Sequence, residues 1–168
     1  MLRARDAINL NEKALTLRPK TDIVAVASSG GHWQQLLLAT QTLRLTRSVL
    51  YVTTKPELLA QAGIENGRTV LDCNRDTLGK MVKSIFQCLS IILVHRPAVV
   101  ISTGAAPGII CLAAGRLIGA HTIWIDSFAN VEKLSMSGKI ARYVANTWLT
   151  QWEHLSTARG PTYAGELL

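Results

Sequence analysis

From residue 22 onward, short continuous apolar runs alternate along the chain with longer stretches of mixed polarity. The interior of residues 22–28 (DIVAVAS) is apolar and rich in valine and isoleucine, which is typical of a strand covered on both faces. Comparable runs predict further strands at residues 48–53, 68–72, 98–102, 121–126 and 147–150. The stretches between them predict helices at residues 33–45, 56–62, 78–95, 107–118 and 137–146. This alternation predicts an α/β fold, a doubly wound parallel sheet of the Rossmann-like kind.

The length and composition suit a single folded domain. The chain has 168 residues, of which 48% are hydrophobic, enough for one buried core. We expect residues 21–168 to form that domain, preceded by a basic segment at residues 1–20. Because cationic and apolar side chains are mixed in this segment, it suits either an amphipathic helix at a membrane surface or a surface helix packed on the domain.

Residues 85–94 (IFQCLSIILV) are apolar enough to raise the question of a membrane span. A span needs about 20 residues, and extending this run brings in Lys80 and Lys83 on one side and residues 95–97 (HRP) on the other. A helix that crosses the sheet explains the same run without a bilayer. Contact of this helix with lipid headgroups, with both lysines facing acidic phosphates, stays open.

The formal net charge of +7 favours an anionic partner, which can be nucleic acid, an acidic membrane surface or a phosphorylated ligand. Aromatic residues make up only 5% of the chain, and no basic run is interleaved with Phe or Tyr, which argues against nucleic acid. The three cysteines include no CxxC pair, and no signal peptide with a cleavage site opens the chain. We therefore expect a reduced, cytosolic protein without a metal site or a cofactor.

Ligands of open parallel sheets bind beyond the carboxyl ends of the strands, so the loops after the strands are where chemistry is expected. The first loop, residues 28–32 (SSGGH), joins a strand directly to a predicted helix. Its glycines allow close backbone approach, and free N–H groups at a helix start favour a phosphate. We predict that Ser29, Gly30 and Gly31 contact a diphosphate, with Gly31 as the position where a Cβ would crowd the ligand or force an unfavourable φ. A tight turn without a ligand is the alternative, and the loop matches neither the dinucleotide nor the P-loop fingerprint.

His32 follows the two glycines at the start of the predicted helix. A neutral imidazole beside a bound diphosphate can accept a proton from a sugar hydroxyl, which makes His32 a candidate catalytic base. The alternative is a histidine that only caps the helix or forms a structural hydrogen bond.

Two later strands are also followed by small and polar residues, which suit contacts to a second part of the same ligand and to sugar hydroxyls. The candidate contact residues in these two loops are Thr103, Gly104, Ala105, Ser127 and Asn130. Asp126 stands at the start of the later loop, where it can orient or deprotonate an acceptor hydroxyl. Capping of the following helix is its alternative role.

Several motifs in a fixed order carry a resemblance to a known family. They are residues 28–32 (SSGGH), 96–105 (RPAVVISTGA), 126–139 (DSFANVEKLSMSGK), 151–153 (QWE) and 163–168 (YAGELL). With them, the chain resembles the small acceptor-side subunit of the two-part N-acetylglucosaminyltransferase of dolichol-linked oligosaccharide synthesis, and more closely its bacterial relatives in capsule and exopolysaccharide assembly. The similarity runs from residue 22 to the end. The family commonly has Glu and Arg where this chain has Asp126 and Asn130.

The chain is also similar to the amino-terminal half of the single-chain transferase that adds N-acetylglucosamine to an undecaprenyl-diphosphate acceptor in peptidoglycan synthesis. That resemblance implies the amino-terminal half of a GT-B fold, in which the first domain binds the lipid-linked acceptor and the second binds the UDP-sugar. Because the chain stops after the first domain, the resemblance implies a separate donor-binding subunit and no transfer by this chain alone.

Together these resemblances imply the acceptor-binding and membrane-recruiting subunit of a heteromeric inverting glycosyltransferase, peripheral to the cytoplasmic face of the inner membrane. The complex would transfer a sugar from a UDP-sugar to a polyprenyl-diphosphate-linked saccharide in cell-surface polysaccharide biosynthesis, with His32 or Asp126 assisting deprotonation of the acceptor. Two rival functions stay open. One is a non-catalytic membrane anchor for a catalytic partner, and the other is a small Rossmann nucleotide-binding protein, which the missing dinucleotide fingerprint weakens.

Overall fold

A parallel sheet forms the centre of the computed structural model, which describes residues 21–72 and 78–167. Within these residues the strands are β1 (Ile23–Val26), β2 (Val49–Thr53), β3 (Gly67–Thr69), β4 (Val99–Ser102), β5 (His121–Ile125), β6 (Thr147–Thr150) and β7 (Thr162–Tyr163). They lie in the order β3-β2-β1-β4-β5-β6-β7, and every neighbouring pair is parallel. The predicted basic helix at residues 1–20 lies outside the described residues and stays a prediction.

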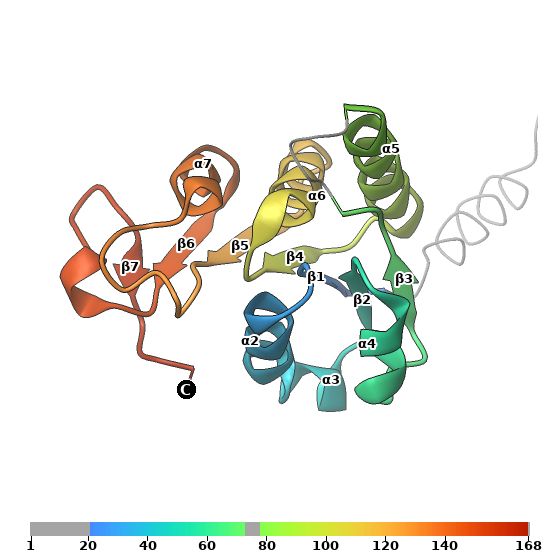
Figure 1. Cartoon of the computed structure of the whole chain (residues 1–168), viewed down its shortest axis with the longest axis horizontal. Coiled ribbons are helices and arrows are strands. Elements are labelled where there is room, and N and C mark those ends of the chain that lie inside the picture. The colour runs from blue at the N-terminus through green and yellow to red at the C-terminus, as the bar shows by residue number, and fades with distance from the viewer. Residues whose placement is uncertain (1–20, 73–77, 168) are drawn as a thin grey trace, which may run out of the picture.

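Helices cover both faces of the sheet (Figure 1). One face carries α2 (Gly31–Thr40), α3 (Leu43–Thr46) and α4 (Pro56–Gln61), and the other carries α5 (Leu78–His95), α6 (Ala105–Leu117) and α7 (Met136–Val144). A short 3-10 helix, η1 (Glu153–Leu155), precedes β7. The predicted doubly wound, Rossmann-like α/β fold is therefore confirmed.

The core lies in two layers because alternate residues of each strand point to opposite faces of the sheet. In β1, Val24 and Val26 belong to the cluster under α5 and α6, where they join Ile92 and Leu112. Its alternate residues belong to the cluster under α2, together with Trp33. Both faces of β1 are thus buried, as its uninterrupted apolar sequence predicts.

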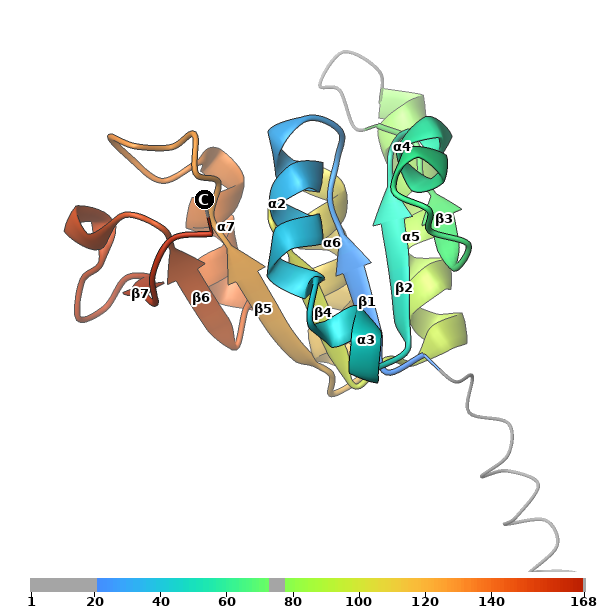
Figure 2. The same ribbon diagram turned by 90° about the horizontal axis from the view of Figure 1, so that it is seen from below.

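The strand order reverses at β1, which pairs with β2 on one side and with β4 on the other. Strands β2 and β3 lie on one side of β1, and β4 to β7 lie on the other. Val26 lies opposite Ser102, so β1 and β4 end side by side. The loop after β1 leads to α2 on one face, and the loop after β4 leads to α6 on the other (Figures 1 and 2). Diverging connections of this kind open a crevice at the carboxyl edge of a sheet, which is where such folds bind ligands.

Several element boundaries differ from those predicted. The helix expected at residues 33–45 begins earlier, at Gly31, and divides into α2 and α3. At the end of α2, the hydroxyl of Thr40 donates to the carbonyl of Leu36 and also bonds the Tyr51 hydroxyl. The hydrogen bond from the Gln41 N–H to the carbonyl of Leu38 tightens the last turn of α2. β7 and η1 were not predicted from the sequence, since elements of two or three residues have no periodic pattern of apolar positions.

The apolar run at residues 85–94 lies in α5, which packs against α6 on the sheet. Ser84, Cys88 and Ile92 form the buried side of this helix. In the described part of the chain, no helix combines the length and the apolar character needed to cross a bilayer. The packing of α5 against α6 agrees with the prediction that residues 85–94 belong to a helix that crosses the sheet.

Candidate functional site

The loop after β1 presents the backbone at the start of α2. Gly30 is the N-cap residue, with φ 75°, and no side chain caps this end of the helix. Gly31 is exposed, and a Cβ built on it would have no heavy atom within 4 Å. Because the first N–H groups of a helix have no partner within the helix, this end offers donors to an anion. The expectation that Gly31 needs an unusual φ is wrong, since the positive φ belongs to Gly30.

The loop after β4 has a similar form. Gly104 is the N-cap residue of α6, again without a side-chain cap, and its N–H donates to the Ser102 hydroxyl at 3.2 Å. Ala105, the next residue, has φ 67°, a left-handed conformation that is rare for a residue with a Cβ. Conformations of this kind persist at functional sites, where the surroundings enforce them. Two helix starts without side-chain caps thus lie beyond the neighbouring ends of β1 and β4.

His32 and Thr103 tie these two loops together. The imidazole Nδ1 of His32 lies 3.0 Å from the carbonyl oxygen of Thr103, and the Thr103 hydroxyl donates to the carbonyl of His32 at 2.6 Å. Gly104 makes room for the ring, because a Cβ built there would fall on the His32 imidazole. The structure therefore brings together five of the predicted residues: Gly30, Gly31, His32, Thr103 and Gly104.

Asp126 lies at the end of β5, one strand further along the sheet, and is only 2% exposed. Its Oδ1 accepts hydrogen bonds from the Ser135 hydroxyl at 2.7 Å and from Trp124 Nε1 at 3.3 Å. Its Oδ2 accepts from the Ser135 backbone N–H at 3.1 Å. Ser135 is in turn the N-cap residue of α7. Both carboxylate oxygens are thus occupied by groups that position the start of this helix.

The remaining predicted residues of this loop, Ser127 and Asn130, lie in a turn. Ser127 is buried, and its hydroxyl accepts the N–H of Ala129 at 3.3 Å, while its carbonyl accepts the N–H of Asn130. Asn130 is partly exposed. The turn therefore uses the serine side chain locally and leaves the asparagine at the surface.

Residues near the C-terminus brace the loop after β5, a contact that sequence reasoning missed. The side-chain amide of Gln151 donates to the carbonyl of Asp126 at 2.9 Å. Trp152 stacks on Phe128, with ring centroids 5.4 Å apart, and its Nε1 donates to the Phe128 carbonyl. The only sequence signal was the QWE motif, which indicates family but not contact. The tryptophan serves as a packing anchor here.

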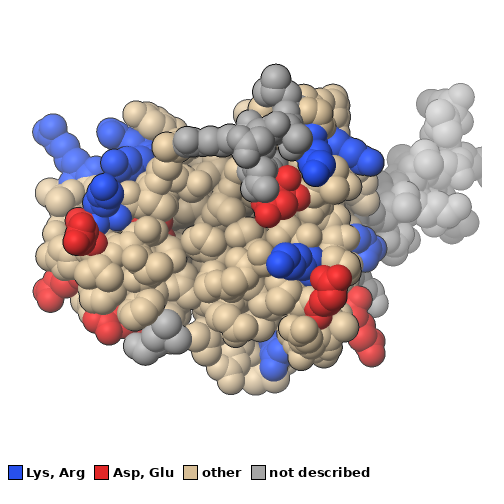
Figure 3. All heavy atoms as spheres, viewed as in Figure 1, with Lys and Arg blue, Asp and Glu red and all other residues tan. Residues whose placement is uncertain are grey.

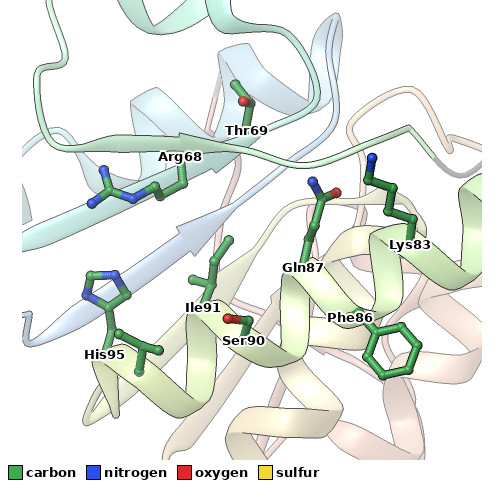
Figure 4. Close-up of a pocket in the computed structure, with 9 residues that line it drawn as sticks. Arg68, Thr69, Lys83, Phe86, Gln87, Ser90, Ile91 and His95 are labelled. Carbon is green, nitrogen blue, oxygen red and sulfur yellow. The ribbon is translucent and has the colours of Figure 1, made fainter.

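A concave feature lies away from these loops, between β3 and α5 (Figure 4). Its volume is about 520 Å³, and its lining residues are Arg68, Thr69, Lys83, Phe86, Gln87, Ser90, Ile91, Val94 and His95. Arg68 and His95 lie toward one end and Lys83 toward the other, while the Phe86 ring turns away from β3. Burial lowers the pKa of His95, and the nearby Arg68 charge adds to the effect. The lining residues include two permanent cations and no carboxylate.

The outer surface of α5 beside this groove is apolar. Val82, Phe86, Leu93 and Val94 are each about half exposed or more, from 48% to 68%. On the face shown in Figure 3, basic side chains gather around the upper end of α5 and, at the upper left of the view, over α7. An apolar helix surface flanked by cations suits a membrane interface.

Comparison with known proteins places this fold and these motifs in a family. The profile described as "Oligosaccharide biosynthesis protein Alg14 like" matches residues 23–167, nearly the whole chain. The chain belongs to the Alg14-like family. This membership confirms the predicted resemblance and, at the level of the family, the expectation of a glycosyltransferase subunit.

Two curated relatives of this Alg14-like chain are both named UDP-N-acetylglucosamine transferase subunit ALG14. The protein from Yarrowia lipolytica is 25% identical over 176 residues, which cover 87% of this chain and 82% of the relative. The protein from Candida albicans is 25% identical over 167 residues, which cover 86% of this chain and 76% of the relative.

Solved structures agree with the Rossmann-like fold of the Alg14-like chain. Acinetobacter baumannii MurG matches with a TM-score of 0.69 and 16% identity, covering 85% of this chain and 45% of MurG. A putative UDP-N-acetylglucosamine 2-epimerase from Listeria monocytogenes matches with a TM-score of 0.56 and 11% identity, covering 79% of this chain and 39% of that protein. The chain thus spans less than half the length of these proteins. The MurG match confirms the predicted correspondence to half of a GT-B fold.

Proposed function

We propose that this Alg14-like chain is the acceptor-binding subunit of a heteromeric inverting glycosyltransferase. The acceptor is a saccharide linked to a polyprenyl diphosphate, and the donor is a UDP-sugar held by a separate subunit. The product serves cell-surface polysaccharide biosynthesis. Because both curated relatives are named for UDP-N-acetylglucosamine, this donor is the first to test.

The observation that carries the proposal is the placement of His32 between two uncapped helix starts. Gly30 and Gly104 begin α2 and α6 at the crevice beside β1, and neither helix start has a side-chain cap. Backbone N–H groups and the positive ends of both helix dipoles therefore favour a diphosphate there. The arrangement supports acceptor binding through backbone donors.

His32 supplies the chemistry of the proposed reaction. A carbonyl oxygen can only accept, so the contact with Thr103 requires a proton on Nδ1, and in the neutral ring Nε2 then carries the lone pair. As the acceptor hydroxyl oxygen attacks the anomeric carbon of the donor sugar, its proton passes to Nε2. The bond between the anomeric carbon and the donor phosphate oxygen breaks, and UDP leaves with the electron pair. Attack from the face opposite UDP inverts the anomeric centre.

Of the two candidate bases, the geometry favours His32. Asp126 is buried, and its oxygens already accept three hydrogen bonds from Ser135 and Trp124. A buried carboxylate engaged in this way is poorly placed to contact a ligand hydroxyl. Its proposed role is to order residues 127–134, which places Ser127 and Asn130 at the rim of the acceptor site.

The donor site is proposed to lie on the partner chain. The matched GT-B structure is more than twice as long as the matched part, since the chain covers 45% of it. The name "subunit" of both curated relatives also supports a divided enzyme. A partner that faces the carboxyl edge of β1 and β4 would bring the donor to the Nε2 of His32.

Recruitment to the membrane is the second part of the proposed function. The apolar surface of α5, with Phe86 and Leu93 exposed, is proposed to contact the cytoplasmic face of the inner membrane. Arg68 and Lys83 in the adjoining groove would then meet acidic headgroups. The same surface supports the rival function of a non-catalytic anchor, so catalysis by His32 must be tested separately.

The test uses the full chain, alone and copurified with its donor-binding partner. Each preparation is assayed for transfer from radiolabelled UDP-N-acetylglucosamine and other UDP-sugars to polyprenyl-diphosphate saccharides. We expect no transfer by the chain alone, and transfer by the pair. His32→Ala in the pair should lower kcat by about 10²-fold to 10⁴-fold, as loss of a general base does. Undiminished transfer by the His32→Ala pair would exclude His32 as the base and favour the anchor.

A further inference from the structure

We infer that Thr103 is a positioning residue that, with Gly104, fixes the tautomer and orientation of His32. The inference rests on the proposed function, because it explains how His32 presents a proton acceptor to the ligand. Sequence reasoning assigned Thr103 to ligand contact. Its side chain is fully buried and its hydroxyl donates to the carbonyl of His32, so Thr103 acts through the histidine.

One residue holds both the backbone and the ring of His32. The Thr103 hydroxyl donates to the His32 carbonyl at 2.6 Å, and the Thr103 carbonyl accepts from Nδ1 at 3.0 Å. These two bonds join loops that are 71 residues apart in sequence. Rotation of the ring would break the Nδ1 bond and leave the Thr103 carbonyl without this donor. The arrangement therefore directs Nε2 away from Thr103.

Gly104 also fixes the position of the His32 ring, because it has no side chain to occupy the same space. A Cβ built on Gly104 would fall on the His32 ring, with the ring atoms Nδ1 and Cε1 nearest. Any side chain at this position must displace the imidazole from the Thr103 carbonyl. Thr103 thus holds the ring through a hydrogen bond, and Gly104 leaves the space that the ring occupies.

His154 provides an internal contrast in the same molecule. Its Nε2, rather than its Nδ1, lies 2.7 Å from a backbone carbonyl, that of Val131. Since carbonyl oxygens only accept, His154 must carry its proton on Nε2 and His32 on Nδ1. The two histidines are therefore expected to adopt opposite tautomers when neutral.

Nuclear magnetic resonance of the full chain, labelled with ¹⁵N at histidine and purified in detergent, measures these tautomers without substrate or partner. Spectra are recorded at about pH 8.5, two pH units above the ordinary imidazole pKa of about 6.5. We expect the two-bond and three-bond ¹H–¹⁵N pattern of an Nδ1–H ring for His32 and of an Nε2–H ring for His154. Protonation of His32 on Nε2 would overturn the inference.

Three variants test the source of the tautomer. Thr103→Ser keeps the hydroxyl and should keep the His32 pattern, whereas Thr103→Val and Gly104→Ala should convert it to a mixture of tautomers. The His154 pattern should stay unchanged in all three, which serves as the control for folding at a distance. An unchanged His32 pattern in folded Thr103→Val and Gly104→Ala proteins would contradict the inference. If either variant fails to fold, the wild-type pattern decides.

Transfer by the assembled pair separates this inference from the proposed function. Thr103→Val should lower kcat on the order of 10-fold with little change in KM for the acceptor, because a displaced base affects the chemical step more than binding. Thr103→Ser should restore the rate. If His32→Ala abolishes transfer but Thr103→Val behaves as wild type, positioning by Thr103 is wrong and the proposed base stands. If the tautomers are as expected but His32→Ala transfers normally, the proposed base is wrong and the positioning geometry stands.

Discussion

Ser135 donates both its backbone N–H and its hydroxyl to the carboxylate of Asp126, at 3.1 and 2.7 Å. The same hydroxyl accepts the N–H of Gly138 and so caps α7. This pair fixes the end of β5 to the start of α7, and residues 127–134 form the loop between these two anchor points. A Cβ on Gly138 would approach Asp126 Oδ1 to 2.6 Å, so the helix start is packed closely on the carboxylate.

Removing either member of this pair should destabilise the fold. Asp126→Ala leaves the buried donors of Trp124 and Ser135 without their acceptor, which should cost about 2–3 kcal/mol in the free energy of unfolding. Ser135→Ala loses the helix cap and one bond to the carboxylate, about 1–2 kcal/mol. Urea unfolding of both variants and of the double variant measures their coupling. Ser137→Ala, in the first turn of the same helix, is the control, and purely additive losses would contradict a direct Asp126–Ser135 link.

The two glycines of the first loop should respond differently to a methyl group. Gly30 has φ 75° and ψ −142°, a conformation that a residue with a Cβ rarely adopts, so Gly30→Ala should lower the free energy of unfolding by roughly 1–3 kcal/mol. At Gly31 the added Cβ meets no heavy atom within 4 Å, and alanine suits a helix, so stability should be unchanged or slightly raised.

Gly31→Ala should instead weaken acceptor binding, because the methyl group enters the predicted diphosphate site. Thermal unfolding and acceptor titration of the assembled pair measure the two effects, and normal acceptor affinity in both Gly31→Ala and Gly31→Val proteins would remove the diphosphate assignment.

Ala105 should be a position where glycine stabilises the protein. Its φ of 67° strains a residue with a Cβ, so Ala105→Gly should raise the free energy of unfolding by up to about 1 kcal/mol. The neighbouring Ala106 is exposed in the first turn of α6, and Ala106→Gly should lower stability by up to about 1 kcal/mol. Chemical denaturation of the two variants side by side gives opposite signs if the strain at Ala105 is real. Equal losses would show that position 105 tolerates alanine without strain.

The apolar surface of α5 should control membrane attachment. Phe86 is 68% exposed on this helix, and Phe86→Ser should reduce cosedimentation of the chain with vesicles that contain acidic phospholipids. Leu45 is 79% exposed on α3, on the opposite face of the sheet, and Leu45→Ser is the matched control. Lys83→Glu should weaken attachment most at low salt, since screening removes the attraction between exposed charges. Equal losses for the two serine variants would show that α5 has no special role.

Much of the fold follows from the sequence because parallel strands are buried on both faces. The continuous apolar run of β1 requires that helices cover both faces of this strand. Because strands and helices alternate, all strands run in parallel and their carboxyl ends lie at one edge of the sheet. That topology predicts that the loops of Gly30, His32 and Gly104 lie side by side, without any knowledge of side-chain packing. The strand β7 was not predictable, since its two residues gain their conformation from pairing with β6.

The roles of individual side chains within the site depended on distances that the sequence does not contain. The contacts of Asp126 with Ser135, nine residues later, favour a structural role for this carboxylate, and no pattern in the sequence indicates them. The link from Thr103 to His32 depends on the register between β1 and β4, where Val26 lies opposite Ser102. Hydroxyl and carbonyl groups are common in loops, so only this register shows which of them meet.

His32 directly follows Gly31, so their Cα atoms are only about 3.8 Å apart, and the ring is tied back to the loop after β4. If Gly31 binds the diphosphate, the proton acceptor cannot reach a hydroxyl far from that diphosphate. In that arrangement, an acceptor with a short saccharide would keep its terminal hydroxyl nearer to His32 than a long glycan would. The length of the saccharide would then limit which hydroxyl of the acceptor His32 can reach.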